Sequence, residues 1–386
     1  MIAYNRQTLD NLTIQEEAAT AFRKDCIDKD TYLAIKQAHQ VNFYTPNSMI
    51  RIGLFILTSI IIIFSLGLIS LAALDHTSAF TTIFIFFGIA CYGALELFIK
   101  EKKVYQAGID DALLWAAMLF FAGSTVFDKE FSATTYSLLA LLLTLLATLR
   151  FGGIVTAAAT YLAFLASLFC ILMEIGGFMQ VILPFLIMLV SSGVYIITRK
   201  AASKQSFRHY KHCLIVVEVL SLISLYLAGN YFVVRELSNE MFNMNLQPGQ
   251  SIPGGWIFWI LTFVIPPVYL YLGIRKKDAI LLRTGLVLLA VIIFTIRQYH
   301  HVLPLETMMV LAGIIMTVGA WALIKYLHAP KHGFTYLETD EPGLADKLKI
   351  ESLIIAQTFT PGPQGPASDV TFGGGTGGGG GASGEY

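Results

Sequence analysis

The first candidates for chemistry are ionisable residues that lie inside long apolar segments of the chain. Glu218 follows Cys213 by five residues, which is about 8 Å into such a segment at the rise of an α-helix. Arg283 lies at a similar depth at the start of a later segment. A charged side chain costs at least about 2.5–3.5 kcal/mol at the centre of a bilayer. We therefore hypothesise that Glu218 and Arg283 form an ion pair, and we keep two alternatives: Glu218 handles protons or ions, or the side chains snorkel to the surface.

A second candidate is a pair of prolines, Pro266 and Pro267, within another apolar segment. Each proline removes a backbone donor, and its ring clashes with the preceding turn, so the pair predicts a helix broken near the middle of the membrane. Broken helices of this kind form the substrate sites of many secondary transporters. Prolines are also frequent in membrane helices that contain no such site.

A third candidate is a polar cluster between two apolar segments, where Arg297, His300 and His301 end one segment and Glu306 opens the next. We expect Arg297 and Glu306 to pair across the turn and the histidines to pack at the membrane surface. A zinc site needs three or four convergent ligands, whereas adjacent histidines point apart on any regular element. We therefore expect no metal here, and no sequence motif indicates a cofactor.

The composition excludes most soluble protein classes. Of the 386 residues, 55% are hydrophobic and 13% are charged, against roughly 25% charged residues in a soluble domain. The formal net charge is zero, so the chain has no polybasic signature for nucleic acid. It also contains no nucleotide-binding loop, HExxH helix or G-x-S-x-G elbow. We expect a membrane protein that does not bind nucleic acid.

The apolar residues are grouped in runs that are long enough to cross a bilayer, which takes about 20 residues in a helix. Transmembrane strands would instead show alternating segments of about 10 residues. The sequence therefore predicts an all-α transmembrane bundle of ten spans. The predicted spans are residues 52–74, 79–99, 108–127, 133–149, 151–172, 178–197, 213–233, 255–273, 279–296 and 304–326.

The basic residues test this span count, because cytoplasmic loops of membrane proteins are enriched in lysine and arginine. If the N-terminus is cytoplasmic, one set of loops and borders holds Arg51, Lys100, Lys102, Lys103, Arg150, Arg199, Lys200, Lys204, Arg208, Lys211, Arg275, Lys276, Lys277, Arg283, Lys325 and Lys331. The opposite set holds Lys129, Arg235 and Arg297. This asymmetry predicts that both termini lie in the cytoplasm.

The chain divides into three predicted parts. Residues 1–48 form a cytosolic two-helix module, residues 49–327 form the helix bundle, and residues 328–386 form a cytosolic tail. From about residue 361 the tail is rich in proline and glycine, which cannot bury enough apolar surface to order itself. Apart from the lipid bilayer, the predicted partners are proteins that bind the module or the tail.

Two helix-start signals define the N-terminal module. Thr13 and Glu16 have the spacing of a capping box, which predicts a first helix from there to about Lys24. Asp28 or Asp30 then caps a second helix.

A short helical module followed by closely spaced spans resembles a group of bacterial multi-pass membrane proteins with no assigned activity. The resemblance covers about the first fifth of the chain, from Ala21-Phe22-Arg23-Lys24 through His39 to Arg51-Ile52-Gly53-Leu54. It implies a location in the bacterial inner (plasma) membrane and no particular reaction.

Three classes of function are compatible with these patterns. The first expectation is a non-enzymatic envelope or scaffold protein that acts on partners through its module and tail. The alternative is a secondary transporter or ion-conducting protein that uses Glu218 and the break at Pro266 and Pro267. An enzyme with His300, His301 and Glu306 at the outer face is the third class, and we expect that the chain is not an enzyme.

Overall fold

A computed structural model describes residues 1–72, 77–126, 131–176, 178–242, 250–252 and 254–299, together with isolated helical positions between 307 and 325. Contacts divide the chain into two units, residues 1–321 and 322–386. Only Lys325 of the second unit is described, so the described fold is that of the first unit. The tail predicted to be disordered lies outside the described residues.

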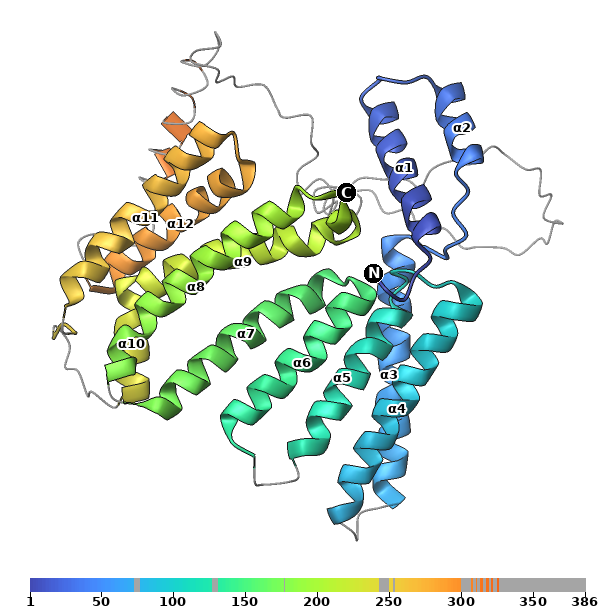
Figure 1. The fold of residues 1–386 in the computed structure, drawn as a ribbon, viewed down its shortest axis with the longest axis horizontal. Coiled ribbons are helices and arrows are strands. Elements are labelled where there is room, and N and C mark those ends of the chain that lie inside the picture. Colours follow the sequence, from blue (N-terminus) through green and yellow to red (C-terminus); the bar gives the residue numbers. More distant parts are fainter. Residues whose placement is uncertain are drawn as a thin grey trace, which may run out of the picture. The chain divides into compact units, whose positions relative to one another are not determined.

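The described chain is built from helices, and Figure 1 labels them in order. Their bounds are α1 Arg6–Arg23, α2 Lys29–Ala38, α3 Ser48–Ala72, α4 Thr77–Lys102, α5 Ile109–Val126, α6 Ala133–Phe151, α7 Ile154–Ile175, α8 Phe178–Ala202, the 3₁₀ helix η1 Gln205–Tyr210, α9 Lys211–Gly229, α10 Tyr231–Phe242, α11 Gly255–Lys276 and α12 Ala279–Tyr299. Strand-like pairing in the described residues is limited to one isolated bridge between Tyr44 and Val104.

Eight of the described helices are long and apolar enough to span a bilayer, which makes this a helical multi-pass membrane protein. They contain the first, second and fourth to ninth predicted spans. The third predicted span corresponds to α5, which is helical over 18 residues but is not among the eight. The tenth predicted span, residues 304–326, lies outside the described residues except for isolated helical positions. The multi-pass helical architecture is thus confirmed, while the count of ten spans stays a prediction.

Helices that follow one another in sequence pack as antiparallel pairs, as in α4 with α5, α6 with α7, α8 with α9 and α11 with α12 (Figure 1). The turn between α6 and α7 shows why the fourth and fifth spans separate. Gly152 adopts a left-handed conformation (φ +69°), and a Cβ atom there would lie 2.5 Å from the Met1 side chain. Glycine is the residue that tolerates both constraints, so the chain reverses here.

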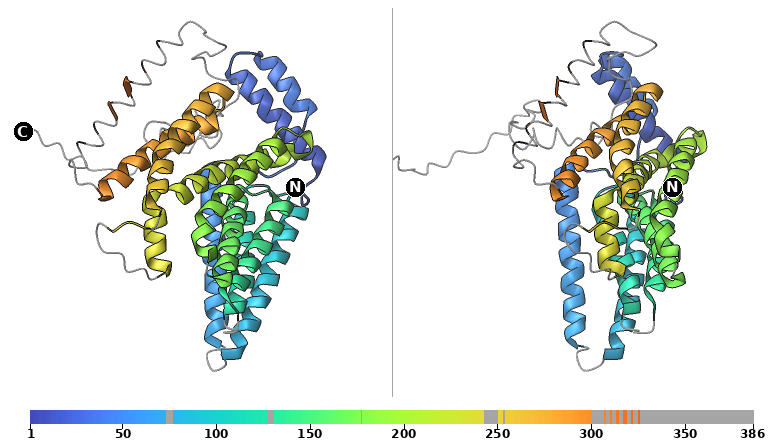
Figure 2. Two further views of the ribbon diagram at one scale, coloured as in Figure 1. Left: turned by 60° about the vertical axis from the view of Figure 1, so that its left-hand side comes forward. Right: turned by 90° about the vertical axis from the view of Figure 1, so that its left-hand side faces the viewer.

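The two N-terminal helices form a separate hairpin at one end of the bundle, which we call the proximal end (Figure 2). Helix α1 begins earlier than predicted, at Arg6, because the Asn5 side chain accepts a hydrogen bond from the Gln7 amide and caps it. Asp28 caps α2 as predicted. The rings of Phe22 and Tyr32 stack between the two helices, 5.2 Å apart.

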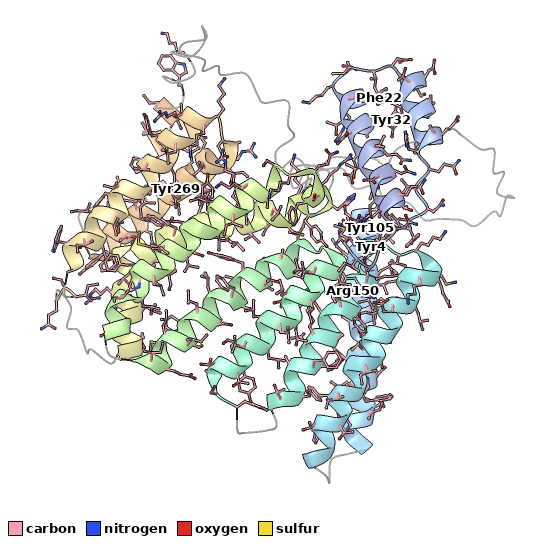
Figure 3. All side chains as sticks on the ribbon, viewed as in Figure 1. Tyr4, Phe22, Tyr32, Tyr105, Arg150 and Tyr269 are labelled. Carbon is pink, nitrogen blue, oxygen red and sulfur yellow. The ribbon has the colours of Figure 1, made fainter. Side chains whose placement is uncertain are left out.

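The residues before α1 anchor this hairpin to the bundle. The Ala3 amide donates a 3.0 Å hydrogen bond to the Arg150 carbonyl at the end of α6. The Tyr4 ring is buried edge-on against Phe43 and Tyr105, at 5.9 and 5.0 Å (Figure 3). Burial raises the pKa of Tyr105 to about 12 and raises the pKa of Tyr4 as well, so both rings stay neutral at physiological pH.

Two ion pairs tie neighbouring helices together at the proximal end. Arg150 contacts Glu96 of α4 at 2.6 Å, and Arg51 of α3 contacts Asp111 of α5 at 2.6 Å. Asp110 accepts hydrogen bonds from the amides before α5, both at 3.0 Å, and so caps that helix. These three carboxylates therefore have fixed partners in the described structure.

The aromatic anchor leads to a testable prediction. Replacing Tyr4 by alanine removes a buried aromatic ring and is expected to weaken docking of the N-terminal hairpin by about 3 kcal/mol. Hydrogen exchange of the peptide that covers residues 1–10 should then become faster. Tyr44→Ala, which makes the same change at an exposed ring, should leave the exchange unchanged. Equal exchange in the Tyr4 variant and in the wild type would contradict the anchor.

Candidate functional site

One face of α9 is polar and deeply buried. Its residues Glu218, Leu222, Tyr226 and Asn230 recur every four positions and are each at most 5% exposed. Residues with this spacing lie above one another on a helix, so the face runs for about 18 Å from Glu218 to Asn230. Side chains of α8, α11 and α12 pack against Leu222 and Tyr226 of this face, and α7 also contacts α9. This face carries the candidate site.

Glu218 lies about 10 Å from the start of α9, within one of the eight apolar helices. The nearby Ser221 hydroxyl donates its 2.7 Å hydrogen bond to the backbone carbonyl of Glu218 and not to the carboxylate. Among the described residues, no hydrogen bond reaches the carboxylate. The residue is 5% exposed, and its carboxylate oxygens are not among the fully buried polar atoms that lack a partner. A carboxylate inside an apolar helix is costly unless water, a proton or a cation reaches it.

The nearest charges come from two other elements. Arg199, near the end of α8, forms an ion pair with Asp278, which precedes α12. Arg199 also donates a 2.5 Å hydrogen bond to the Tyr195 hydroxyl one turn earlier on α8. Arg199 and Asp278 are the charged side chains that pair at this end of α8. Their opposite charges largely offset each other while they are paired.

A tight hairpin between α11 and α12 positions Asp278. Lys277 adopts a left-handed conformation, and the Asp278 amide then donates a 2.8 Å hydrogen bond back to the Gly273 carbonyl. A Cβ atom at Gly273 would lie 2.8 Å from the Leu282 amide, so only glycine allows this close approach. The Asp278 carboxylate accepts the Ile280 amide at 2.9 Å and caps α12.

The ion pair predicted between Glu218 and Arg283 is not formed in the described structure. Arg283 is exposed on α12, whereas the buried face of that helix carries Leu281, Leu288 and Ile292. Equal depth in the membrane was therefore not enough to predict the ion pair, because Arg283 faces away from α9. The cation near Glu218 is Arg199 instead.

The distal end of the same face of α9, opposite the proximal end, holds a fully satisfied polar network. Asn230 is 0% exposed and separates α9 from α10. Its side-chain amide donates to the Tyr226 hydroxyl at 3.0 Å and to the Thr295 hydroxyl at 3.1 Å. Its carbonyl oxygen accepts the amides of Phe232 and Val233 and caps α10. The seventh predicted span, residues 213–233, is therefore interrupted at Asn230.

Helix α11 closes the buried face from the side. The Tyr269 hydroxyl donates a 3.1 Å hydrogen bond to the Leu222 carbonyl, and the Thr262 hydroxyl accepts the Tyr231 amide at 2.9 Å. Tyr269 is labelled in Figure 3. These bonds attach α11 to α9 and to the start of α10.

The break predicted at Pro266 and Pro267 is absent, since α11 runs without interruption from Gly255 to Lys276. Pro266 is buried in the bundle and Pro267 is exposed. Hydrogen bonds from Tyr269 and to Thr262 attach the buried side of the helix to its neighbours on either side of the two prolines. The helix break lies at Asn230, where the side chain replaces the lost backbone bonds.

The third predicted cluster is described only in part. Arg297 is half-buried near the end of α12, and its Nη1 atom has no hydrogen-bond partner in the described part of the chain. His300, His301 and Glu306 lie outside the described residues, so the pair of Arg297 with Glu306 stays a prediction. No group of three or more metal-ligating side chains occurs among the described residues.

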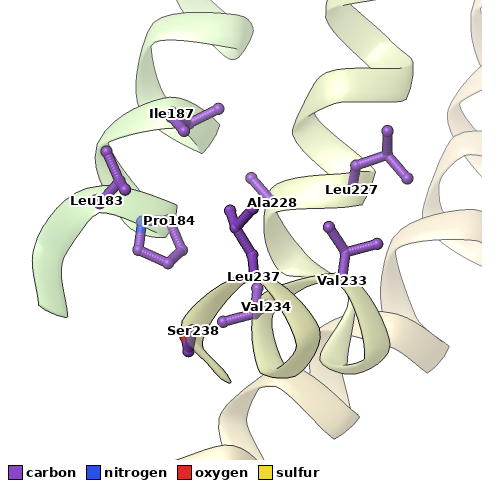
Figure 4. Close-up of a pocket in the computed structure, with 9 residues that line it drawn as sticks. All are labelled: Leu183, Pro184, Ile187, Leu227, Ala228, Val233, Val234, Leu237 and Ser238. Carbon is purple, nitrogen blue, oxygen red and sulfur yellow. The ribbon is translucent and has the colours of Figure 1, made fainter. Parts of the chain in front are cut away.

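An apolar groove lies beside the site, between α8, α9 and α10 (Figure 4). Its cavity volume is about 50 Å³, and its nine lining residues are apolar except for Ser238. Pro184 and Val234 face each other across it. Because the groove offers no charged group, it is not part of the candidate site.

The sequence interpretation identified Glu218 but missed three residues around it: Tyr195, Arg199 and Asp278. Arg199 was read as one of many basic residues of a cytoplasmic loop, and Asp278 follows three basic residues that hid it. The signal that could have found Asp278 is its position directly before an apolar segment, where aspartate commonly caps a helix.

A comparison of the chain with protein-family models, curated proteins and solved structures finds no match.

The Asn230 network leads to a second prediction. Asn230→Ala removes the partners of two buried hydroxyls and two amides, and is expected to destabilise the protein by about 2–4 kcal/mol. Thermal unfolding in detergent should show a melting temperature lowered by several degrees. Thr295→Val, which removes one of these partners, should have a smaller effect. Asn42→Ala, at an exposed position, should have none, and an unchanged melting temperature for Asn230→Ala would refute the network.

Proposed function

We propose that this protein moves protons or small cations across a membrane, and that the Glu218 carboxyl group binds and releases the ion. The observation that carries the proposal is the burial of Glu218 inside an apolar helix without a hydrogen bond to its carboxylate in the described structure. Ionisable groups at such depth are costly, and they commonly mark ion pathways or proton relays.

A purely structural function would fit a carboxylate with fixed partners. Glu96 and Asp111, which are paired with Arg150 and Arg51, show how this chain satisfies structural carboxylates. Glu218 differs because the nearby cation, Arg199, is engaged by Asp278. A carboxyl group in that position can change between a neutral protonated form and an ionised form that needs a cation.

The small size of the described cavities supports a small ion as the substrate. The cavity near Tyr4 and Asp110 has a volume of about 30 Å³ and the apolar groove has about 50 Å³, and neither contains Glu218. A solute pocket would hold several convergent polar groups around a larger space. A proton needs only a titratable group and a chain of polar atoms.

The orientation is part of the proposal. The basic residues of the proximal end, such as Lys200, Lys276 and Lys277, support a cytoplasmic location for this end in a bacterial inner membrane. Glu218 would then lie nearer to the cytoplasm, and Asn230 nearer to the outer face. Binding of partners to the N-terminal module and the tail, as expected of a scaffold, stays a prediction on which no described contact bears.

Flux measurements test the proposal. Wild-type protein in liposomes should move protons or an alkali cation under an imposed potential, as reported by an internal pH or cation dye. Glu218→Gln removes the titratable proton but keeps the shape, and is expected to lower the flux by about 100-fold.

Glu240→Gln serves as the matched control, because it makes the same change at an exposed position of α10 and should keep the full flux. Gel filtration and thermal unfolding must show that both variants are folded. Equal flux in wild type and folded Glu218→Gln would disprove the assignment of Glu218, and absence of any flux in the wild type would disprove ion transport.

A further inference from the structure

A small cavity lies where the N-terminal segment meets the proximal end of the bundle. Tyr4 lines it from the segment before α1, Asp110 and Asp111 line it from the start of α5, and Gly152 lines it from the turn between α6 and α7. We propose that this cavity binds one alkali cation, with the Asp110 carboxylate and the Tyr4 hydroxyl among its ligands. The site does not include Glu218, so it stands apart from the proposed ion transport.

Asp110 is a buried carboxylate without a cationic partner. The residue is 6% exposed and forms no ion pair with any described residue. Its two 3.0 Å hydrogen bonds, from the amides of Ala107 and Gly108, both reach the Oδ1 atom, which leaves the Oδ2 atom for another ligand. A charged carboxylate removed from water needs a compensating cation. Asp110 lacks the compensation that Arg51 gives to Asp111.

The Tyr4 hydroxyl is the second unpartnered group at this cavity. The residue is 8% exposed, and the rings of Phe43 and Tyr105 hold its own ring edge-on and so fix the position of the hydroxyl. No described residue forms a hydrogen bond with this hydroxyl. It is not among the fully enclosed atoms that lack a partner, so part of its surface is accessible, and the cavity accounts for that surface. The hydroxyl is thus available as a neutral oxygen ligand.

The remaining lining supplies further oxygen atoms and a negative charge. Asp111 uses its Oδ2 atom for Arg51, and the side-chain nitrogen of Gln106 donates to the Tyr105 hydroxyl at 3.3 Å. The Oδ1 atom of Asp111 and the side-chain oxygen of Gln106 are left as further oxygen ligands, since both residues line the cavity. With two carboxylates against one guanidinium, one negative charge remains. A monovalent cation neutralises it.

The size of the cavity limits the ligand to one small ion. Its volume is about 30 Å³, which is room for one or two particles of the size of a water molecule. A magnesium ion keeps several of its own waters, and calcium takes about six to eight oxygen ligands, so both need a larger site. Oxygen ligands also disfavour the softer transition metals. The size and the single uncompensated charge therefore select an alkali cation.

Amide hydrogen exchange tests this site in the full chain in lipid nanodiscs. The background is Glu218→Gln, so that cation binding to the proposed transport group cannot produce the result. Sodium chloride or potassium chloride replaces choline chloride at constant ionic strength, since the choline cation is too bulky for the cavity. At an alkali concentration about ten times the dissociation constant, exchange of the peptide that covers residues 1–10 should be about tenfold slower than in choline.

Two substitutions remove ligands and keep the packing. Tyr4→Phe retains the buried ring but lacks the hydroxyl, and Asp110→Asn retains an oxygen that caps α5 but lacks the charge. Both should lose most of the difference between alkali and choline salts. Asp30→Asn, the same change at an exposed carboxylate of α2, should keep the full difference.

Equal exchange in sodium, potassium and choline salts would overturn the site and assign the cavity to water. A full alkali effect in folded Tyr4→Phe and Asp110→Asn would overturn it as well, because the cation would then bind elsewhere. Loss of the effect in these two variants, with the effect kept in Asp30→Asn, would support the site whether or not the protein transports ions.

Discussion

The interaction on which the proximal end of the bundle depends is the ion pair between Arg199 of α8 and Asp278, which precedes α12. A carboxylate inside an apolar helix needs a cation or a proton, because neither water nor hydrogen-bond donors stabilise it there. Arg199 is paired with Asp278 and forms no ion pair with Glu218 in the described structure. This pair joins the proximal end of α8 to the α11–α12 hairpin.

The two ends of the buried face of α9 show opposite solutions to the burial of polar groups. At Asn230 each side-chain donor and acceptor has a partner, and three helices are joined by hydrogen bonds with ordinary distances. At Glu218 the carboxylate has no such partner in the described structure. The same helix is therefore able to satisfy a buried polar side chain completely, which makes the exception at Glu218 informative.

Hydrophobic run length predicted the helical membrane architecture well, because the bilayer demands long apolar helices whatever their packing. Glu218 could be found for the same reason, since a charge in an apolar run is visible without a structure. Its partner could not be predicted: Arg283 has the right depth, but depth does not tell which way a side chain faces. The helix break was also misplaced, because packing held α11 together across Pro266 and Pro267 while Asn230 ended α9.

The most direct test of the central claim is to observe the protonation of Glu218 itself. Infrared difference spectra of the protein in lipid, recorded while the pH is raised, should show a protonated-carboxyl band that disappears on titration. The same band should be absent from folded Glu218→Gln, because an amide cannot titrate. Identical carboxyl spectra for the wild type and for this variant would show that Glu218 does not change its protonation state, and would contradict the account.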